Sequence, residues 1–188
     1  METTVTATLD RTQTAVLLID YQELLFNAMP ERLRDRNLHQ ATTLLHAARV
    51  MDLSVIVTEQ YPRGLGPTLG PLLGAYEAMR PYPKLEFSAA EVDEVLRDLE
   101  QQQTTDVLIL GMETHICVLQ TVMALQKRGL RCHVMADAVL SRRTLDWKRG
   151  LALCEAAGAT VSTIEIALFQ LLGSADADHF KAVSRLIR

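Results

Sequence analysis

Cys117 is the residue whose type and position point most directly to chemistry. It follows an unbroken apolar run at residues 107–110, the punctuating Gly111, and the start of a segment in which apolar residues recur at helical spacing. This pattern predicts a buried strand, a tight turn and a helix that holds Cys117 in its first turn. Unpaired N–H groups and the positive end of a helix dipole favour a thiolate at such a position, which would make Cys117 a nucleophile. The alternative is a small buried thiol of the core, which is what most free cysteines are.

Two charged residues, Asp20 and Lys84, are the candidates for a site shared with Cys117. Asp20 stops the apolar run of the first predicted strand, so its carboxylate is expected at the C-terminal end of that strand. Lys84 comes directly after Tyr82 and Pro83, at the end of a long connection. Taken alone, Asp20 suits a turn or a helix cap, and Lys84 suits a solvated surface position.

The elements that must position these residues alternate between strands and helices. Strands are predicted at residues 14–20, 53–58, 107–110, 131–136 and 159–163, and helices at residues 31–51, 88–101, 116–128, 144–157, 164–172 and 175–188. This alternation predicts a three-layer α/β/α fold around a doubly wound, mainly parallel sheet of five to six strands. Ligands of such sheets bind beyond the carboxyl ends of the strands, where the strand order reverses. That reversal separates the first strand from the strand halfway along the chain, so Asp20 and Cys117 are expected at one crevice.

The connection at residues 61–83 is long for a compact domain. It contains five of the six prolines and four glycines, and segments of this length are usually functional or disordered. Leu69, Leu72, Leu73 and Met79 argue against disorder. We therefore expect a loop that folds over one end of the sheet and brings Lys84 to the crevice, while residues 137–143 are expected to form a turn.

Length, composition and charge exclude several classes of protein. The chain has 188 residues, 48% of them hydrophobic and 22% charged, which suits one domain at residues 1–188 with a polar N-terminal extension at residues 1–12. A net charge of −4 without a basic block disfavours nucleic acid as a partner. No apolar run is long enough to cross a bilayer and no signal-peptide core is present, so no membrane association is expected. The three cysteines form no C-x-x-C pair, which indicates a reduced, cytoplasmic protein in which Cys132 and Cys154 belong to the core.

Four segments carry a resemblance to a known family. They are Leu-Leu-Ile-Asp-Tyr-Gln at residues 17–22, Thr-Glu-Gln-Tyr-Pro at 58–62, Lys-Leu-Glu-Phe-Ser at 84–88 and Gly-Met-Glu-Thr-His-Ile-Cys-Val at 111–118. With them the chain resembles the isochorismatase-like hydrolases, the cysteine hydrolase superfamily that also includes nicotinamidase and N-carbamoylsarcosine amidohydrolase. The segment at 58–62 and Phe-Gln-Leu-Leu-Gly at 169–173 are most similar to the isochorismatase domain-containing branch.

The resemblance implies a role for each candidate residue. Cys117 would attack a carbonyl or related carbon, Asp20 would take the thiol proton and later activate water, and Lys84 would hold both groups and favour the thiolate. The family also carries a cis peptide before its cysteine helix, which here falls between Met112 and Glu113. The backbone N–H groups of Glu113 and Cys117 would then form an oxyanion hole.

The pocket and the cofactor requirement follow from the loops after the first two strands. Four loop residues are expected to line the substrate pocket: Gln22, Phe26, Glu59 and Tyr61. Family nicotinamidases bind a metal through an Asp and two His after the second strand, a region that here reads Glu-Gln-Tyr at 59–61. The five histidines show no ligand-like spacing either, so we expect no metal, no cofactor and no nicotinamidase activity. True isochorismatases share the fold but lack the cysteine, so Cys117 argues against cleavage of a vinyl ether.

The resulting hypothesis is a metal-free cysteine hydrolase that acts on a small amide or related C–N bond through a covalent thio-intermediate. The resemblance also implies a homo-oligomer. Two alternatives remain open. One is a catalytically silent oligomer that binds a small molecule or serves as a scaffold. The other is a redox-active thiol protein, in which Cys132 or Cys154 would have to approach Cys117 in space to resolve its oxidised form.

Overall fold

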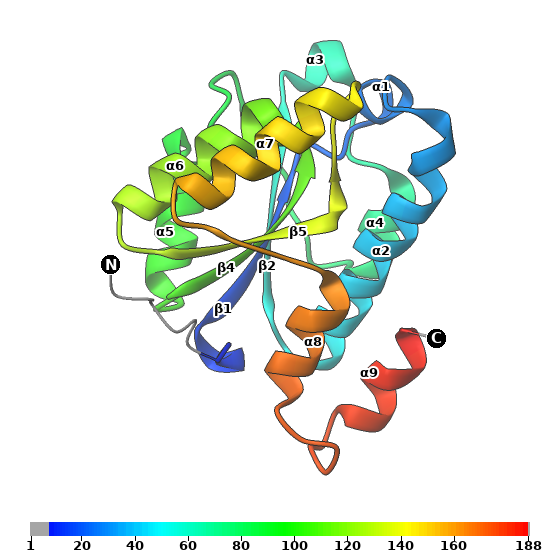
Figure 1. The fold of residues 1–188 in the computed structure, drawn as a ribbon, viewed down its shortest axis with the longest axis vertical. Coiled ribbons are helices and arrows are strands. Elements are labelled where there is room, and N and C mark those ends of the chain that lie inside the picture. The colour runs from blue at the N-terminus through cyan, green and yellow to red at the C-terminus, as the bar shows by residue number, and fades with distance from the viewer. Residues whose placement is uncertain (1–7, 188) are drawn as a thin grey trace.

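A six-stranded sheet forms the centre of the computed structural model, which describes residues 8–187 of the chain (Figure 1). All strand pairs are parallel, and the order across the sheet is β3-β2-β1-β4-β5-β6. The strands are β1 (Thr14–Ile19), β2 (Ser54–Gln60), β3 (Tyr82–Lys84), β4 (Asp106–Met112), β5 (Arg131–Leu140) and β6 (Thr160–Ser162). The expected doubly wound fold is thereby confirmed, with the order reversing between β1 and β4.

Helices cover both faces of this sheet. One face carries α2 (Glu31–Val50), α4 (Gly70–Ala75), α8 (Ile164–Leu172) and α9 (Phe180–Leu186). The other carries α5 (Asp93–Gln101), α6 (Leu119–Lys127) and α7 (Thr144–Ala156). Shorter elements lie in the connections: α1 (Glu23–Asn27), α3 (Pro62–Leu65), the 3₁₀ turns η1 (Arg11–Gln13) and η2 (Ala89–Glu91), and the π-helical turn η3 (Thr114–Val118).

The apolar strand residues divide between two cores according to the two-residue period of a strand. In β1, Val16 and Leu18 pack into the core under α2 and α8, while Leu17 and Ile19 pack into the core under α5 and α6. Because both faces are covered, every residue of β1 and β4 is buried. The unbroken apolar runs in the sequence are the direct result of this arrangement.

The long connection after β2 contains more regular structure than the sequence indicates. It forms α3 and α4, and it ends in β3, whose three residues pair with β2 from Thr58 to Gln60. Leu72 and Met79 are buried within it, as the apolar positions suggested. The short strand β3 is what moves Lys84 from a loop to the edge of the sheet, beside the carboxyl end of β2.

The end of β5 differs from the sequence-based prediction. Residues 137–140 belong to β5 rather than to a turn, since β5 continues past a register irregularity opposite Ile109 and Gly111. Within the expected polar extension, Leu9 is buried in the core and Arg11 donates to the carbonyl of Met51, so these two residues pack on the domain. The first seven residues of that expected extension lie outside the described residues.

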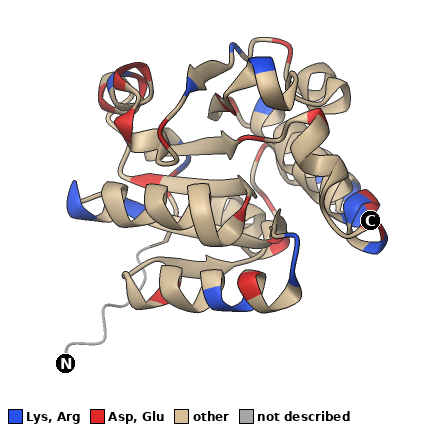
Figure 2. Cartoon of the chain, turned by 90° about the horizontal axis from the view of Figure 1, so that it is seen from above, with Lys and Arg blue, Asp and Glu red and all other residues tan. Residues whose placement is uncertain are grey.

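The surface agrees with the ordinary composition of the chain. In the view of Figure 2, basic and acidic positions are interspersed over the helices and do not gather by sign into one face. Within residues 8–187, no helix has both the length and the apolar content that a membrane span needs.

Substitution of Gly111 tests the close contact between β4 and β1. Its φ of 138° lies in a region that favours glycine, and an added Cβ would overlap the carbonyl oxygen of Ile19. We expect Gly111→Ala to lower the free energy of unfolding by about 2–5 kcal/mol, because backbone strain and overpacking both contribute. Urea unfolding measures this difference. Gly74→Ala is the matched control: that glycine lies in α4 with nothing near its would-be Cβ, so its substitution should leave the stability unchanged or raise it by about 1 kcal/mol at most. Equal effects of the two substitutions would contradict the close approach.

Candidate active site

A buried ion pair between Lys84 and Asp20 lies at the carboxyl end of the sheet. The Lys84 Nζ donates to Asp20 Oδ2 at 2.7 Å, and both side chains are fully buried. The same nitrogen donates to Gln60 Oε1 at 2.6 Å and to the carbonyls of Glu86 and Phe87 at 3.3 and 3.1 Å. Burial of a lysine and an aspartate is expensive unless they pair and their other polar atoms are bonded, and this arrangement meets that condition.

The ends of β1 and β2 fix the Asp20 carboxylate. Asp20 follows β1 directly, with a left-handed φ of 53°, and its backbone N–H donates to the carbonyl of Thr58 at 3.1 Å. The Thr58 hydroxyl donates to Asp20 Oδ1 at 2.8 Å. Each carboxylate oxygen therefore has a donor, one from β2 and one from the end of β3.

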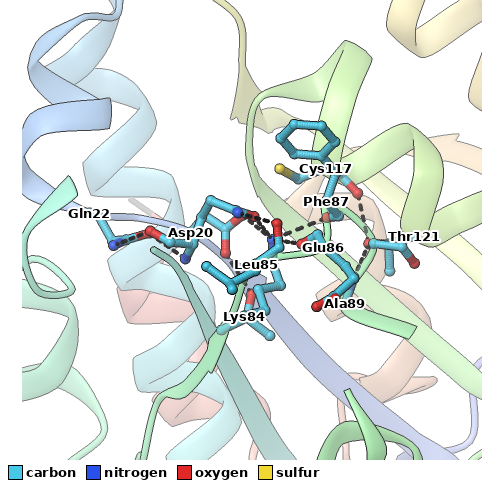
Figure 3. Close-up of polar contacts among 12 residues, drawn as sticks. Asp20, Gln22, Lys84, Leu85, Glu86, Phe87, Ala89, Cys117 and Thr121 are labelled. Carbon is cyan, nitrogen blue, oxygen red and sulfur yellow. Dashed lines mark hydrogen bonds and ion pairs between the residues drawn. The ribbon is translucent and has the colours of Figure 1, made fainter. Parts of the chain in front are cut away.

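Cys117 reaches the same place from the other side of the strand-order reversal (Figure 3). It lies in η3, directly before α6, and is 5% exposed. Asp20 and Cys117 are close enough for each to shift the pKa of the other. The Thr121 hydroxyl donates to the Cys117 carbonyl at 2.7 Å and accepts from the Ala89 N–H at 2.8 Å, so the cysteine segment is tied to the chain that follows Lys84.

Burial and two nearby charges act on the protonation of Cys117. Burial and the nearby Asp20 charge raise the pKa of the Cys117 thiol to about 12, and the opposing effects of Lys84 and of the Glu113 backbone N–H do not compensate. Burial likewise raises the pKa of Asp20, against the charge of Lys84. The loss of hydration on burial therefore outweighs the helix-start effect that favours the thiolate. With its pKa raised in this way, the Cys117 thiol is favoured over the thiolate at neutral pH.

The segment before Cys117 has the backbone geometry that the resemblance implied. The Met112–Glu113 peptide is cis, and the N–H of Glu113 acts on the Cys117 sulfur. The carboxylate of Glu113 accepts from the Arg142 backbone N–H at 2.9 Å and from the Arg142 Nε at 3.0 Å. The predicted oxyanion hole of the Glu113 and Cys117 N–H groups remains a prediction, with one of the two groups already directed at the sulfur.

The four residues expected to line the pocket have different surroundings. Gln22 is fully buried: its amide donates to the carbonyls of Gln60 and Gly66 and accepts from the Gln60 N–H. Phe26 is 7% exposed and packs against Tyr21 in the core.

The other two lie nearer the surface. Glu59 Oε1 accepts from both the N–H and the hydroxyl of Thr68, at 2.7 Å each, and Tyr61 is half exposed. These contacts tie Gln22, Phe26 and Glu59 to their neighbours, and the role of all four residues in a substrate pocket stays a prediction.

Sequence reasoning missed three residues that hold the site: Thr58, Gln60 and Thr121. Thr58 and Gln60 stand two apart at the end of β2, and this spacing places both side chains on one face of a strand. That signal was present in the sequence. The sequence gave no such signal for Thr121, because its role depends on a hydrogen bond from the Ala89 N–H, 32 residues away.

The sequence predicts no metal site, in particular at residues 59–61 after β2. Within the described part of the chain, no group of three or more His, Cys, Asp or Glu side chains is arranged to hold a metal ion.

The chain is similar to known proteins in both sequence and structure. Residues 14–166 match the model of the isochorismatase domain. Isochorismatase domain-containing protein 2 from Bos taurus is 41% identical over 149 residues, which cover 79% of this chain and 71% of that protein. The solved structure of the MAR1 ribonuclease from Caenorhabditis elegans has a TM-score of 0.91 at 34% identity and covers 96% of this chain and 92% of its own. The YcaC gene product from Escherichia coli, described as an octameric hydrolase of unknown specificity, shares the fold with a TM-score of 0.88 at 19% identity over 96% of this chain and 89% of its own.

Fold and relatives together define a hydrolase-type α/β domain. The chain belongs to the isochorismatase family, and its similarity to the isochorismatase domain-containing proteins confirms the resemblance inferred from the motifs.

The buried ion pair can be tested by removing one charge and then both. Lys84→Met leaves Asp20 buried without its partner, and we expect it to lower the free energy of unfolding by about 3–5 kcal/mol at pH 7. Asp20→Asn combined with Lys84→Met should recover much of this loss, because no uncompensated charge remains. The deficit of Lys84→Met should also shrink as the pH falls, since a carboxyl whose folded-state pKa is raised destabilises the fold only where it is ionised. A pH-independent deficit in chemical unfolding would argue against the pair.

The thiol state of Cys117 can be read from its alkylation. With a pKa of about 12, the rate of reaction with iodoacetamide should rise with pH up to pH 10 without a plateau, as followed by mass spectrometry of the peptide that contains Cys117. The urea-unfolded chain is the control, since its cysteines should titrate near about 8.5. A plateau below pH 8 in the folded protein would mean a resting thiolate.

Proposed function

We propose that the chain is a cysteine hydrolase that cleaves a small amide or a related C–N bond, with Cys117, Asp20 and Lys84 as its catalytic set. The observation that carries this proposal is the buried Lys84–Asp20 pair, placed where its carboxylate acts on the Cys117 thiol. A stable fold has no need of a buried aspartate and lysine at this position, since apolar residues of similar size would serve as well or better.

The first half of the reaction forms a thioester. The Cys117 sulfur attacks the carbonyl carbon while its proton passes to Asp20, which the raised pKa of the carboxyl favours. The N–H groups of Glu113 and Cys117 stabilise the oxygen that gains negative charge. The C–N bond then breaks, and the leaving amine takes the proton from Asp20.

The second half of the reaction restores the cysteine. Asp20 removes a proton from water, and the resulting nucleophile attacks the thioester carbon. The C–S bond breaks, the sulfur regains a proton, and the acid product leaves. Lys84 keeps the carboxylate in place through both halves and limits how far its pKa can rise.

The charge of the site indicates a neutral reacting group. Lys84 and Asp20 compensate each other, and the four acceptors around the lysine nitrogen occupy its three N–H donors, so none is free for a substrate carboxylate. Leu85 and Phe87, next to Lys84, and Tyr61 at the end of β2 are all more than half exposed, which gives the surroundings an apolar character. An uncharged amide with a small apolar substituent fits this description better than an ionic substrate.

The name of the Caenorhabditis elegans neighbour raises a second candidate, cleavage of RNA. Recognition of a phosphate backbone depends on clustered Lys and Arg side chains. The net charge of −4, the mixed charges of Figure 2 and the compensated Lys84 do not supply such a cluster. The amide reaction is therefore preferred, and RNA belongs in the assay as the competing substrate.

The redox alternative depends on a second cysteine close to Cys117. Cys132 and Cys154 are both buried, and the charge of Cys154 acts on the pKa of Cys132 rather than on that of Cys117. This placement favours a hydrolase over a dithiol switch.

Assembly and location remain predictions. Exposed large apolar side chains on α7 and α8, such as Leu145, Ile166 and Phe169, offer surface for the homo-oligomer that the resemblance implies. The cytoplasmic location still follows from cysteine usage in the sequence.

A substrate panel of small amides, ureas and hydroxamates, with an RNA oligonucleotide alongside, tests the proposal. Cys117→Ser should lower kcat/KM on the active compound at least about 10³-fold, because the nucleophile acts as one unit with its base. Cys154→Ala is the matched control, a buried cysteine on α7 whose substitution should leave kcat/KM unchanged. Mass spectrometry after rapid quenching should find the acyl part of the substrate on Cys117. Retained turnover in Cys117→Ser, or activity on RNA alone, would reject the proposal.

A further inference from the structure

A cavity of about 430 Å³ lies beside β5, and none of the catalytic candidates lines it. It exists because β6 pairs only with residues 133–135 of β5, while β5 continues to Leu140. The far half of β5 is therefore an uncovered sheet edge, with α2 on one side and α7 on the other (Figure 1). A volume of this size is within the range of small-molecule sites.

The apolar part of the wall comes from three elements. Leu33 of α2, Val139 and Leu140 of β5, and Trp147 of α7 line the cavity. Trp147 is the single tryptophan of the chain, and its Nε1–H donates to the Val139 carbonyl at 3.1 Å. The indole is thus held in place as a preformed aromatic wall.

Two neutral polar side chains in the wall, Asn37 and Ser141, are already bonded within the protein. Asn37 accepts from the Tyr21 hydroxyl at 2.7 Å and donates to the Asp137 carbonyl at 3.3 Å. The Ser141 hydroxyl bonds to His115 Nδ1 at 3.0 Å. These groups shape the cavity and have little hydrogen-bonding capacity left for a ligand.

The charged donors in the wall are two arginines. Arg32 and Arg36 stand four residues apart on α2, so they share one face of the helix, and both line the cavity. No hydrogen bond or ion pair within residues 8–187 engages either guanidinium. The single acid in the wall, Asp137, directs both carboxylate oxygens to the Ile164 N–H at 3.1 and 3.3 Å. With two arginines and one bonded aspartate, the wall has a net charge of +1.

We propose that this cavity binds a small carboxylate with an aromatic or aliphatic body, at a site separate from Cys117. The apolar body would lie against Trp147 and Leu140, and the carboxylate would accept hydrogen bonds from Arg36 and Arg32, a pairing that suits the planar guanidinium. The inference does not depend on the chemistry of Cys117, since it needs only the walls and charges of the cavity.

Trp147 supplies the readout, because its fluorescence reports on this cavity alone in the full-length chain. Titration with 3-phenylpropionate should change the emission and saturate, whereas the neutral 3-phenylpropionamide should bind about tenfold more weakly, as expected when a charge-assisted hydrogen bond is lost. Arg36→Gln should raise the Kd for the acid about tenfold and remove the preference over the amide. Arg49→Gln, a change of the same type at the other end of α2 and outside the cavity, is the control and should bind like the unmodified chain.

A cavity-filling variant locates the probe. Thr144 lines the cavity from the exposed start of α7, so Thr144→Phe should fill part of it and weaken binding of both acid and amide, while the circular dichroism spectrum stays unchanged. The proposal is overturned by equal affinity for acid and amide, by binding that neither Arg36→Gln nor Thr144→Phe alters, or by no response up to about 10 mM probe, where even millimolar affinity would saturate.

Discussion

The contact on which the site depends is the ion pair between Asp20 and Lys84 in the interior of the protein. Neither charge is tolerable there alone, so each requires the other at bonding distance, and this requirement passes into the backbone. It fixes the end of β1 through Asp20 and the end of β3 through Lys84. The edge strand β3 has only three residues and few backbone hydrogen bonds to β2. The buried bonds of its last residue, Lys84, help to hold it in place. Cys117 then faces a carboxylate whose position is set independently of any substrate.

The strand-order reversal explains why these groups meet, and it is also the part that the sequence predicts best. Apolar runs that end in Asp20 and in Gly111 locate β1 and β4, and the geometry of doubly wound sheets brings their ends together. These inferences are secure because burial on both faces leaves a clear record in residue type. The family motifs add Lys84, whose local sequence would otherwise suit the surface.

What the sequence does not reveal depends on contacts between distant segments. The strand β3 is too short for a periodic pattern, and only its pairing with β2 turns residues 82–84 into a strand. Asp137 looks like a turn residue in the local sequence. In the structure it lies within β5, and its carboxylate accepts a hydrogen bond from the first residue of α8. The resting state of Cys117 is a similar case. The helix start favours the thiolate over a short range, but burial and Asp20, which come from the rest of the fold, decide the balance. The three backbone bonds of the Gln22 amide also depend on segments far along the chain, and no local pattern indicates them.

The bonds from Lys84 to the carbonyls of Glu86 and Phe87 have a mechanical consequence. The ammonium group that holds the Asp20 carboxylate also anchors the backbone from which Leu85 and Phe87 project into solvent. Any movement of residues 85–87 would loosen the lysine, and any shift of the lysine would alter the pKa of Asp20. The conformation of residues 85–87 and the acid–base behaviour of Asp20 are therefore coupled through one side chain, so a substitution that moves this segment would change the pKa of the carboxyl as well.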